Sequence, residues 1–250
     1  MATTGTGRAT ADRLTTGTAA HLRSFLREPV HLALLVAMPP LVVEGYGRAM
    51  SSFPEMPFVS TVPATLGRVN GAVFAAAFLA GLIGLFQVVA ARRADDRLAI
   101  CGFDRATLLA SRLGAVLAVA LAGAVVTFAV LRWQVTPEAP LVALGALVLA
   151  GATYGLLGIL LGAVLPRELE GSLALVFVAD LDTFLASGLV DVDTALVRAL
   201  PLHYPHELFR AAVLEGSVAT ADLRGAVASL AVLLVAVLLV YTRVAGGDHA

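Results

Sequence analysis

Long blocks without a charged residue recur along the chain and predict its architecture. A bilayer core of about 30 Å is crossed by about 20 helical residues. Four uncharged blocks approach or exceed that length, and each predicts a membrane-spanning helix. These blocks are residues 71–91, 113–131, 141–165 and 225–242. Two weaker candidates bring the predicted total to six spans: 30–43, which contains Pro39-Pro40 and runs into Glu44, and 172–190.

Insertion energies separate the fourth span from the fifth. Residues 141–165 contain 13 Leu, Ile or Val and no charge, worth about −4 to −8 kcal/mol. Residues 172–190 contain 10 Leu, Val or Phe, worth roughly −3 to −6 kcal/mol, but two aspartates cost about +2.5 to +3.5 each. The fifth span is therefore expected to pack inside a bundle, line a wet cavity or be interrupted.

Asp180 and Asp182 are the two acids of that fifth span. Acids at membrane depth mark pathways or ion sites by default. The alternative is that the helix breaks early and both acids sit at the outer water boundary. Their spacing of two places them on different helix faces, which disfavours a shared chelating pair.

Composition agrees with a membrane protein and excludes several chemistries. The chain is 59% hydrophobic and 14% charged, whereas soluble domains are about half apolar and about a quarter charged. All 17 basic residues are Arg, which excludes a P-loop ATPase and a lysine-imine enzyme. A single cysteine, Cys101, excludes an intrachain disulfide and multi-cysteine metal sites. No bound cofactor or metal is predicted, and the net charge of −1 suggests no nucleic-acid partner.

Arginine placement predicts the orientation in the cell membrane. With both termini cytoplasmic, the inner segments hold 11 Arg and the outer segments hold 6, as the positive-inside rule requires. Residues 1–12 are expected to be a disordered cytoplasmic tail. Residues 13–244 form the single membrane domain, opened by an interfacial amphipathic helix that ends at Pro29, and 245–250 form a second cytoplasmic tail.

The fourth span carries four glycines at positions i, i+4, i+7 and i+11, on one helix face. They are Gly151, Gly155, Gly158 and Gly162. Glycine lets neighbouring backbones approach closely in a membrane, where no hydrophobic drive replaces that packing. The pattern predicts tight helix packing, with a partner either in this chain or in a second copy.

The segment between the fifth and sixth spans predicts a short helix at the outer surface. Pro205 suits its first turn, and Leu208, Phe209, Ala212 and Val213 stripe one side until Gly216. His203, His206 and Glu207 lack the order and spacing of a zincin motif. His206 and Glu207 are interpreted as favouring the helix start, Glu207 through its charge near the positive end of the helix dipole.

The connection between the second and third spans, residues 92–112, mixes both charge signs around a few apolar residues. That combination is typical of a docking interface, with an apolar centre and a polar rim. Positive-inside topology alone is the competing explanation.

Taken together, these segments resemble the membrane-spanning permeases of type-2 ABC exporters over about residues 13–244. Arg27-Glu28-Pro29 precedes a first span ending MPPLVVEGYG, and ARRADDRLAICGFDRATLLASRLGA stands where the family keeps its coupling helix. A glycine-rich fourth span follows, and LPLHYPHELFRAAVLEG stands where the family has short re-entrant helices. The chain departs from the family at Asp180 and Asp182, which precede Ser187-Gly188.

The resemblance implies an all-α fold with six transmembrane helices. It also implies that the protein exports a substrate, using ATP that is bound with Mg and hydrolysed on separate ABC ATPase subunits. A second permease copy, identical or homologous, and membrane lipid are the other implied partners. The expected ATPase contacts are Arg92, Arg93, Asp95, Asp96, Arg97, Leu98, Ile100 and Phe103. Asp180 and Asp182 are the candidates for the translocation path, and no catalytic residue is expected.

Two other functional classes compete with transport. One is a membrane enzyme acting on a lipid-linked substrate, with Asp180, Asp182 or His203 as catalytic groups, and it predicts activity without ATP. The other is a non-transporting interaction or immunity protein, which predicts no ATPase partner.

Overall fold

The computed structural model describes residues 4–53, 61–100, 105–165, 167–187 and 195–246, and every regular element within them is an α-helix. The helices are α1 (Thr4–Arg27), α2 (Pro29–Ser51), α3 (Pro63–Ile100), α4 (Arg105–Arg132), α5 (Pro140–Val164), α6 (Glu168–Ala186), α7 (Ala195–Arg198), α8 (His203–Leu214) and α9 (Thr220–Gly246). The predicted all-α fold is therefore confirmed.

Five helices are long and apolar enough to cross a membrane within the described residues. Their spans are Pro29–Ser51, Pro63–Ala91, Thr107–Arg132, Pro140–Val164 and Thr220–Tyr241. α6 is not among them, because four acids lie within its 19 residues: Glu168, Glu170, Asp180 and Asp182. The chain is a multi-pass membrane protein whose fifth predicted span is set apart by these acids, in line with its insertion energy.

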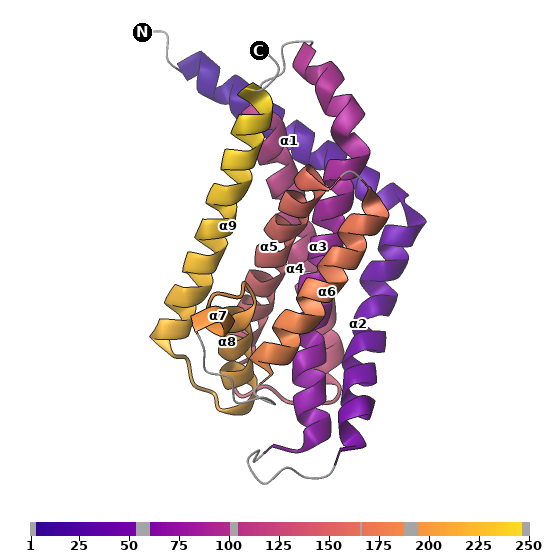
Figure 1. The fold of residues 1–250 in the computed structure, drawn as a ribbon, viewed down its shortest axis with the longest axis vertical. Helices are drawn as coiled ribbons and strands as arrows, with labels where there is room; N and C mark the ends of the chain where they lie inside the picture. The colour runs from indigo at the N-terminus through magenta and orange to yellow at the C-terminus, as the bar shows by residue number, and fades with distance from the viewer. Residues whose placement is uncertain (1–3, 54–60, 101–104, 166, 188–194, 247–250) are drawn as a thin grey trace.

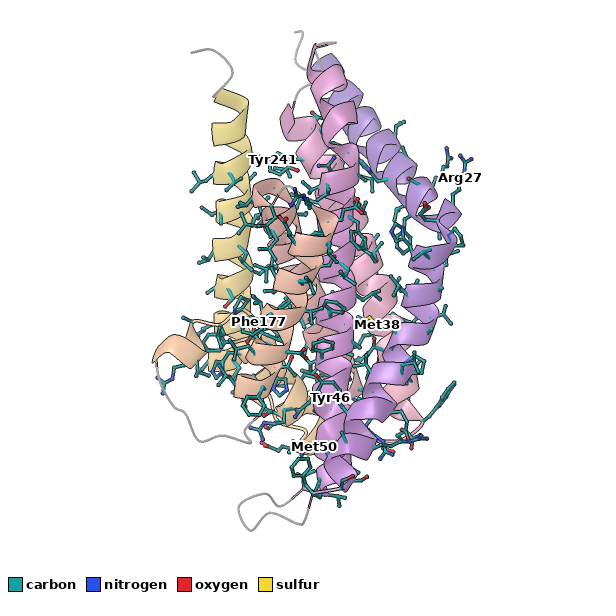
Figure 2. The ribbon with its side chains drawn as sticks, turned by 45° about the vertical axis from the view of Figure 1, so that its right-hand side comes forward. Arg27, Met38, Tyr46, Met50, Phe177 and Tyr241 are labelled. Atoms are coloured by element: carbon teal, nitrogen blue, oxygen red, sulfur yellow. The ribbon has the colours of Figure 1, made fainter. Side chains whose placement is uncertain are left out.

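The long helices run side by side, with α2 and α9 at opposite edges of the bundle (Figures 1 and 2). One end, here called the terminal end, holds α1 and the last residues of α9. The opposite end, here called the capped end, holds α7, α8 and the last turn of α2 (Figure 1). Because α8 packs against α5, α6 and α9, the segment before the last span is part of the bundle rather than a loop beside it.

Proline residues set the start of three long helices. Pro29 and Pro140 occupy the first turns of α2 and α5, and Pro63 begins α3. Proline suits the first turn because its missing N–H would have no intrahelical partner there. Glu28, which precedes Pro29, is extended (φ −89°, ψ 104°), as the residue before proline favours. The chain therefore turns at Glu28, from α1 into α2.

α3 and α5 approach most closely at a seam of glycines. A Cβ at Gly84 would collide with the carbonyl oxygen of Gly155, and a Cβ at Gly158 would collide with that of Gly81. Farther along α5, Gly162 lies against the backbone of Leu85. The glycine row of α5 therefore packs against helices of this same chain. It contacts α3 along the seam and α4 through Ala120 and Val116.

At the terminal end, α1 is longer than expected, and a buried arginine links α4 to α9. α1 begins at Thr4 rather than at residue 13, so residues 4–12 are helical and the predicted disorder is wrong for them. No proline interrupts residues 4–27, and the amphipathic helix therefore extends toward the N-terminus. A buried arginine also joins α4 to α9, since Arg112 donates a hydrogen bond of 2.8 Å to the hydroxyl of Tyr241.

Candidate functional site

The two acids of α6 lie on opposite faces of one helix near the capped end. α6 is continuous to Ala186, so the early helix break considered above does not occur before either acid. Two residues of α-helix correspond to a rotation of about 200°. Accordingly, Asp180 is exposed whereas Asp182 is fully buried.

Asp182 joins α6 to α5 and to the start of α8. Its Oδ2 accepts hydrogen bonds of 2.8 Å from the Tyr154 hydroxyl and of 2.8 Å from the backbone N–H of Leu202. Leu202 is the residue that precedes α8, so the carboxylate lies near the positive end of that helix. The second oxygen, Oδ1, has no hydrogen-bond partner among the described residues.

A second buried pair joins α8 to α3. His206 Nε2 lies 3.0 Å from Asn70 Oδ1, and both residues are buried. An amide oxygen only accepts, so this geometry assigns the proton of the neutral ring to Nε2. Burial, together with the positive charges of Arg210 and His203, lowers the pKa of His206 to about 3. The ring is therefore neutral and serves as a hydrogen-bond donor at neutral pH.

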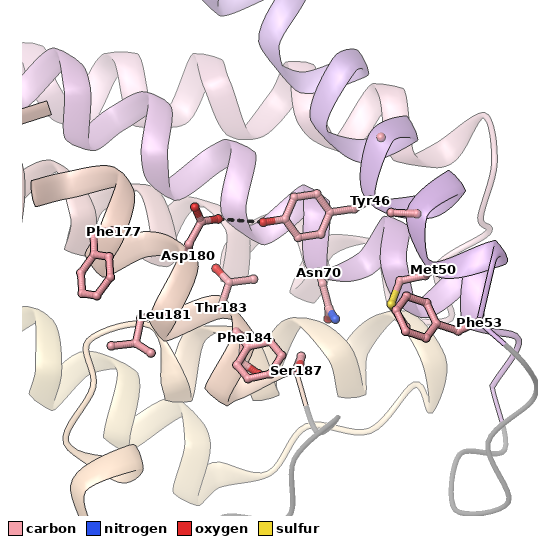
Figure 3. Close-up of a pocket in the computed structure, with 12 residues that line it drawn as sticks. Tyr46, Met50, Phe53, Asn70, Phe177, Asp180, Leu181, Thr183, Phe184 and Ser187 are labelled. Carbon is pink, nitrogen blue, oxygen red and sulfur yellow. Dashed lines mark hydrogen bonds between the residues drawn. The ribbon is translucent and has the colours of Figure 1, made fainter. Parts of the chain in front are cut away.

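Asp180 lies on the other face of α6, beside a pocket of about 590 Å³ between α2, α3 and α6 (Figure 3). The Tyr46 hydroxyl donates a hydrogen bond of 3.0 Å to Asp180 Oδ1 across the pocket. Met50, Phe177 and Phe184 provide apolar lining. The pocket thus places one carboxylate in apolar surroundings, an arrangement that suits a ligand with both apolar and polar or cationic groups.

No known protein-family model matches this chain, and no curated protein matches it. In the structure, Asp182 fastens α8 to the bundle and Asp180 faces a pocket.

Residues 92–100, which include seven of the eight predicted ATPase contacts, lie at the other end of the bundle. α3 continues past its apolar span, which ends at Ala91, and reaches Ile100. The backbone of residues 92–100 is helical, and their side chains are outside the described part of the structure. Phe103 lies outside the described residues altogether. The docking role of this segment stays a prediction.

The short helix before the last span forms as the pattern predicts, but two of its polar residues have other roles. The four stripe residues Leu208, Phe209, Ala212 and Val213 are all buried in α8. His206 is buried against Asn70 rather than placed at the surface. Glu207 pairs with Arg210 at 2.7 Å, so its negative charge has a specific partner besides the helix dipole.

Metal ligation has no support among the described residues, where no group of three His, Cys, Asp or Glu is placed to hold an ion. The His203 ring instead meets the Tyr204 ring edge to face, with centroids 4.9 Å apart.

Sequence reasoning missed Tyr46, Asn70 and Tyr154 as parts of the site. Tyr154 gave a usable signal, because a tyrosine inside a glycine-rich apolar span needs a partner for its hydroxyl. Asn70 directly precedes an apolar block and reads as a boundary residue. Nothing in the linear pattern places it beside a histidine 136 residues later.

Proposed function

We propose that this chain is the transmembrane subunit of an ABC transporter, which exports its substrate with ATP hydrolysed on separate subunits. The proposal rests on the resemblance to type-2 exporter permeases in segment order. The helical bundle agrees with that order in its Pro-containing first span, its glycine-packed fourth span and its short helices before the last span. ATP and Mg would be bound by the partner subunits.

The observation that carries the proposal is the extension of α3. Its helix continues for nine residues beyond the apolar span, from 92 to 100, and that stretch contains three Arg and two Asp. The extension lies at the terminal end, where α1 also lies (Figure 1). A charged helix projecting from a bundle gives an ATPase subunit a rigid element to push, as alternating access requires.

The pocket beside Asp180 supplies a candidate for the translocation path. The α6 residues Phe177, Leu181 and Phe184 line it and remain exposed. We propose that this face meets a second permease copy, with the substrate passing between them and Asp180 lining the path. Asp182, which is buried among α5, α6 and α8, acts as a positioning residue.

The ATPase contact is tested by Phe103→Asp, with Trp133→Asp as the matched control. Trp133 follows α4 at the capped end and is 83% exposed, so a charge there is tolerated and far from the expected contact. Affinity purification of the tagged full chain from its native membrane should recover an ATPase with a Walker lysine. We expect its yield to fall several-fold with Phe103→Asp and to be unchanged with Trp133→Asp.

Recovery of the ATPase at wild-type stoichiometry with Phe103→Asp would contradict the proposed ATPase contact at this segment. Purification of the wild-type chain without any ATPase would overturn the transport proposal itself, and turnover of a lipid-linked substrate by the pure chain without ATP would favour an enzyme.

The single cysteine provides an independent test of orientation. Cys101 follows α3 directly in sequence. A membrane-impermeant maleimide should label it only after the cells are permeabilised. The control is Ser217→Cys in a Cys101→Ser background, which places the thiol at an exposed position after α8. Labelling of Cys101 in intact cells would reverse the proposed orientation.

A further inference from the structure

A second pocket, here called the elbow pocket, lies where α1 turns into α2. Its volume is about 430 Å³, and its walls come from α1, α2, α3 and the first turn of α6. The label of Arg27, the last residue of α1, marks this turn in Figure 2. On α3 the pocket reaches Ala90 and Ala91, where the apolar span ends. The pocket therefore lies at the depth where a bilayer changes from acyl chains to headgroups.

The pocket is bordered by Gln87 of α3, whose amide group is unpaired. Both Oε1 and Nε2 are inaccessible to solvent and have no hydrogen-bond partner among the described residues. His31 of α2 also lines the pocket, and its Nδ1 is unpaired in the same way. Buried polar groups without a partner are uncommon in native structures because each costs about 1–3 kcal/mol. Gln87 offers one acceptor and one donor group to a ligand once its side chain turns toward the pocket.

Two carboxylates stand at the entrance to this pocket. Glu28 lies at the elbow and Glu168 begins α6, and both side chains are exposed. Neither forms an ion pair with a described residue, whereas the neighbouring Glu170 pairs with Arg167 at 2.7 Å. The pocket therefore combines the Gln87 amide with two carboxylates that have no ion-pair partner among the described residues, which favours a cationic ligand.

Aromatic rings form another wall. The His31 ring stacks on Phe25 with centroids 5.3 Å apart, and on Phe86 with centroids 6.1 Å apart. All three residues line the pocket. Because both phenylalanine rings stack on His31 and Phe25 is buried, this wall supplies apolar surface beside the polar groups.

We propose that the elbow pocket binds a primary ammonium group attached to a phosphate, as in the ethanolamine phosphodiester headgroup. An ammonium carries three N–H donors, which match the acceptors of Gln87, Glu28 and Glu168. The Gln87 Nε2–H donates to a phosphate oxygen of the same ligand. A choline headgroup fits poorly, because its methyl groups replace the three donors.

The same chemistry can come from a phosphatidylethanolamine lipid or from a soluble phosphoethanolamine. The position of the pocket at headgroup depth favours the lipid. This inference concerns a site at the opposite end of the bundle from Asp180, and it does not depend on the transport proposal.

The test is isothermal titration calorimetry, in which each probe is titrated into the purified full chain in detergent and the heat of binding is measured. The three probes are short-chain phosphatidylethanolamine, the matching phosphatidylcholine and O-phosphoethanolamine. We expect the first to bind at least tenfold more tightly than the second. Comparable binding of O-phosphoethanolamine would identify a soluble ligand, and its failure to bind would identify the lipid. Equal binding of the two lipids, or binding of none of the probes, overturns the proposal.

The affinities of substituted proteins test which residues bind the ethanolamine headgroup. Gln87→Met keeps the side-chain length but removes both hydrogen-bonding groups, and we expect about tenfold weaker binding of the ethanolamine lipid, as loss of a hydrogen bond to a charged group predicts. Glu168→Gln should weaken it less, and Glu170→Gln is the matched control, since Glu170 is on the same helical turn but does not line the pocket. If Gln87→Met does not fold, Glu28→Gln with Glu168→Gln changes only exposed side chains and must still weaken binding. Wild-type affinity in both the Gln87 variant and this double variant overturns the assignment.

Discussion

The two sides of α6 differ in how they meet the rest of the bundle. On the closed side, Asp182 is held by Tyr154 and the N–H of Leu202, and α5 in turn packs on α3 through glycine with no side chain between. On the open side, Asp180 makes one hydrogen bond to Tyr46 beside a pocket of about 590 Å³. The same residue type, two positions apart, is thus structural on one face and available on the other.

This difference shows that burial and partners, rather than membrane depth alone, decide what an acid in a span does. A buried carboxylate that accepts from two buried donors stabilises the bundle, because those donors would have no acceptor without it. An exposed carboxylate beside a pocket contributes little to stability. Substitutions on the two sides should therefore differ in both size and kind.

Among substitutions compared at neutral pH, the largest expected effect is that of Asp182→Ala. The Tyr154 hydroxyl and the Leu202 N–H would both lose their acceptor while buried, so we expect the free energy of unfolding to fall by about 3 kcal/mol. Thermal unfolding in detergent micelles measures this change. Asp180→Ala is the control and should lower the free energy by less than about 1 kcal/mol. Equal losses in the two variants would mean that the two sides of α6 do not differ.

Gly158→Ala tests the glycine seam behind the closed side. The added methyl group meets the backbone of Gly81, and we expect a loss of about 1–3 kcal/mol in unfolding free energy. Gly145→Ala, on the same helix, is the matched control because nothing lies within 4 Å of its added Cβ. The two melting temperatures can be compared directly. A Gly158→Ala protein as stable as Gly145→Ala would contradict the close approach of α3 and α5.

Acid should weaken the anchoring of α8 through His206. The pKa of His206 is 6.5 when unperturbed and about 3 in the folded chain, so between these values the unfolded state binds a proton that the folded state does not. Its contribution to stability is complete above pH 6.5 and is lost as pH falls toward 3, by up to about 1.4 kcal/mol per pH unit. His206→Gln should unfold with a shallower pH slope over that window. Parallel slopes in the two proteins would contradict the buried neutral ring.

The smallest effects come from removing single hydroxyl groups. Tyr154→Phe should lower the free energy of unfolding by about 1 kcal/mol, since a buried carboxylate loses one of its donors. Tyr46→Phe, on the open side, should change it by less than about 0.5 kcal/mol. Chemical denaturation of both variants gives the comparison, and a larger effect at Tyr46 would reverse the assignment of the two sides.

The helical layout could be predicted because long uncharged blocks permit few alternatives. Four blocks became helices that are long and apolar enough to span, and the weak first span became α2, which continues as a helix through Pro39 and Pro40. The start of α1 was misplaced at residue 13, because the polar, glycine-containing residues 4–12 were interpreted as disordered although they contain no proline.

The site could be predicted only in part. The spacing of Asp180 and Asp182 was enough to place them on different faces, but not to say which face is buried. That depends on Tyr154, Leu202 and the position of α8, all of which are set by tertiary packing. The glycine row showed that a helix must come close, and only the three-dimensional arrangement identifies α3 as that helix.

The anchoring of α8 also limits how the capped end can deform. α8 is tied to α3 through His206 and Asn70, and its leading residue is tied to α6 through Asp182. Moving α8 away from the bundle would break these bonds and expose its own buried side chains Leu208 and Phe209. Under the transport proposal, opening at this end would therefore proceed sideways at the pocket between α2 and α6, and a cargo leaving there would meet the bilayer or a neighbouring subunit before it met water.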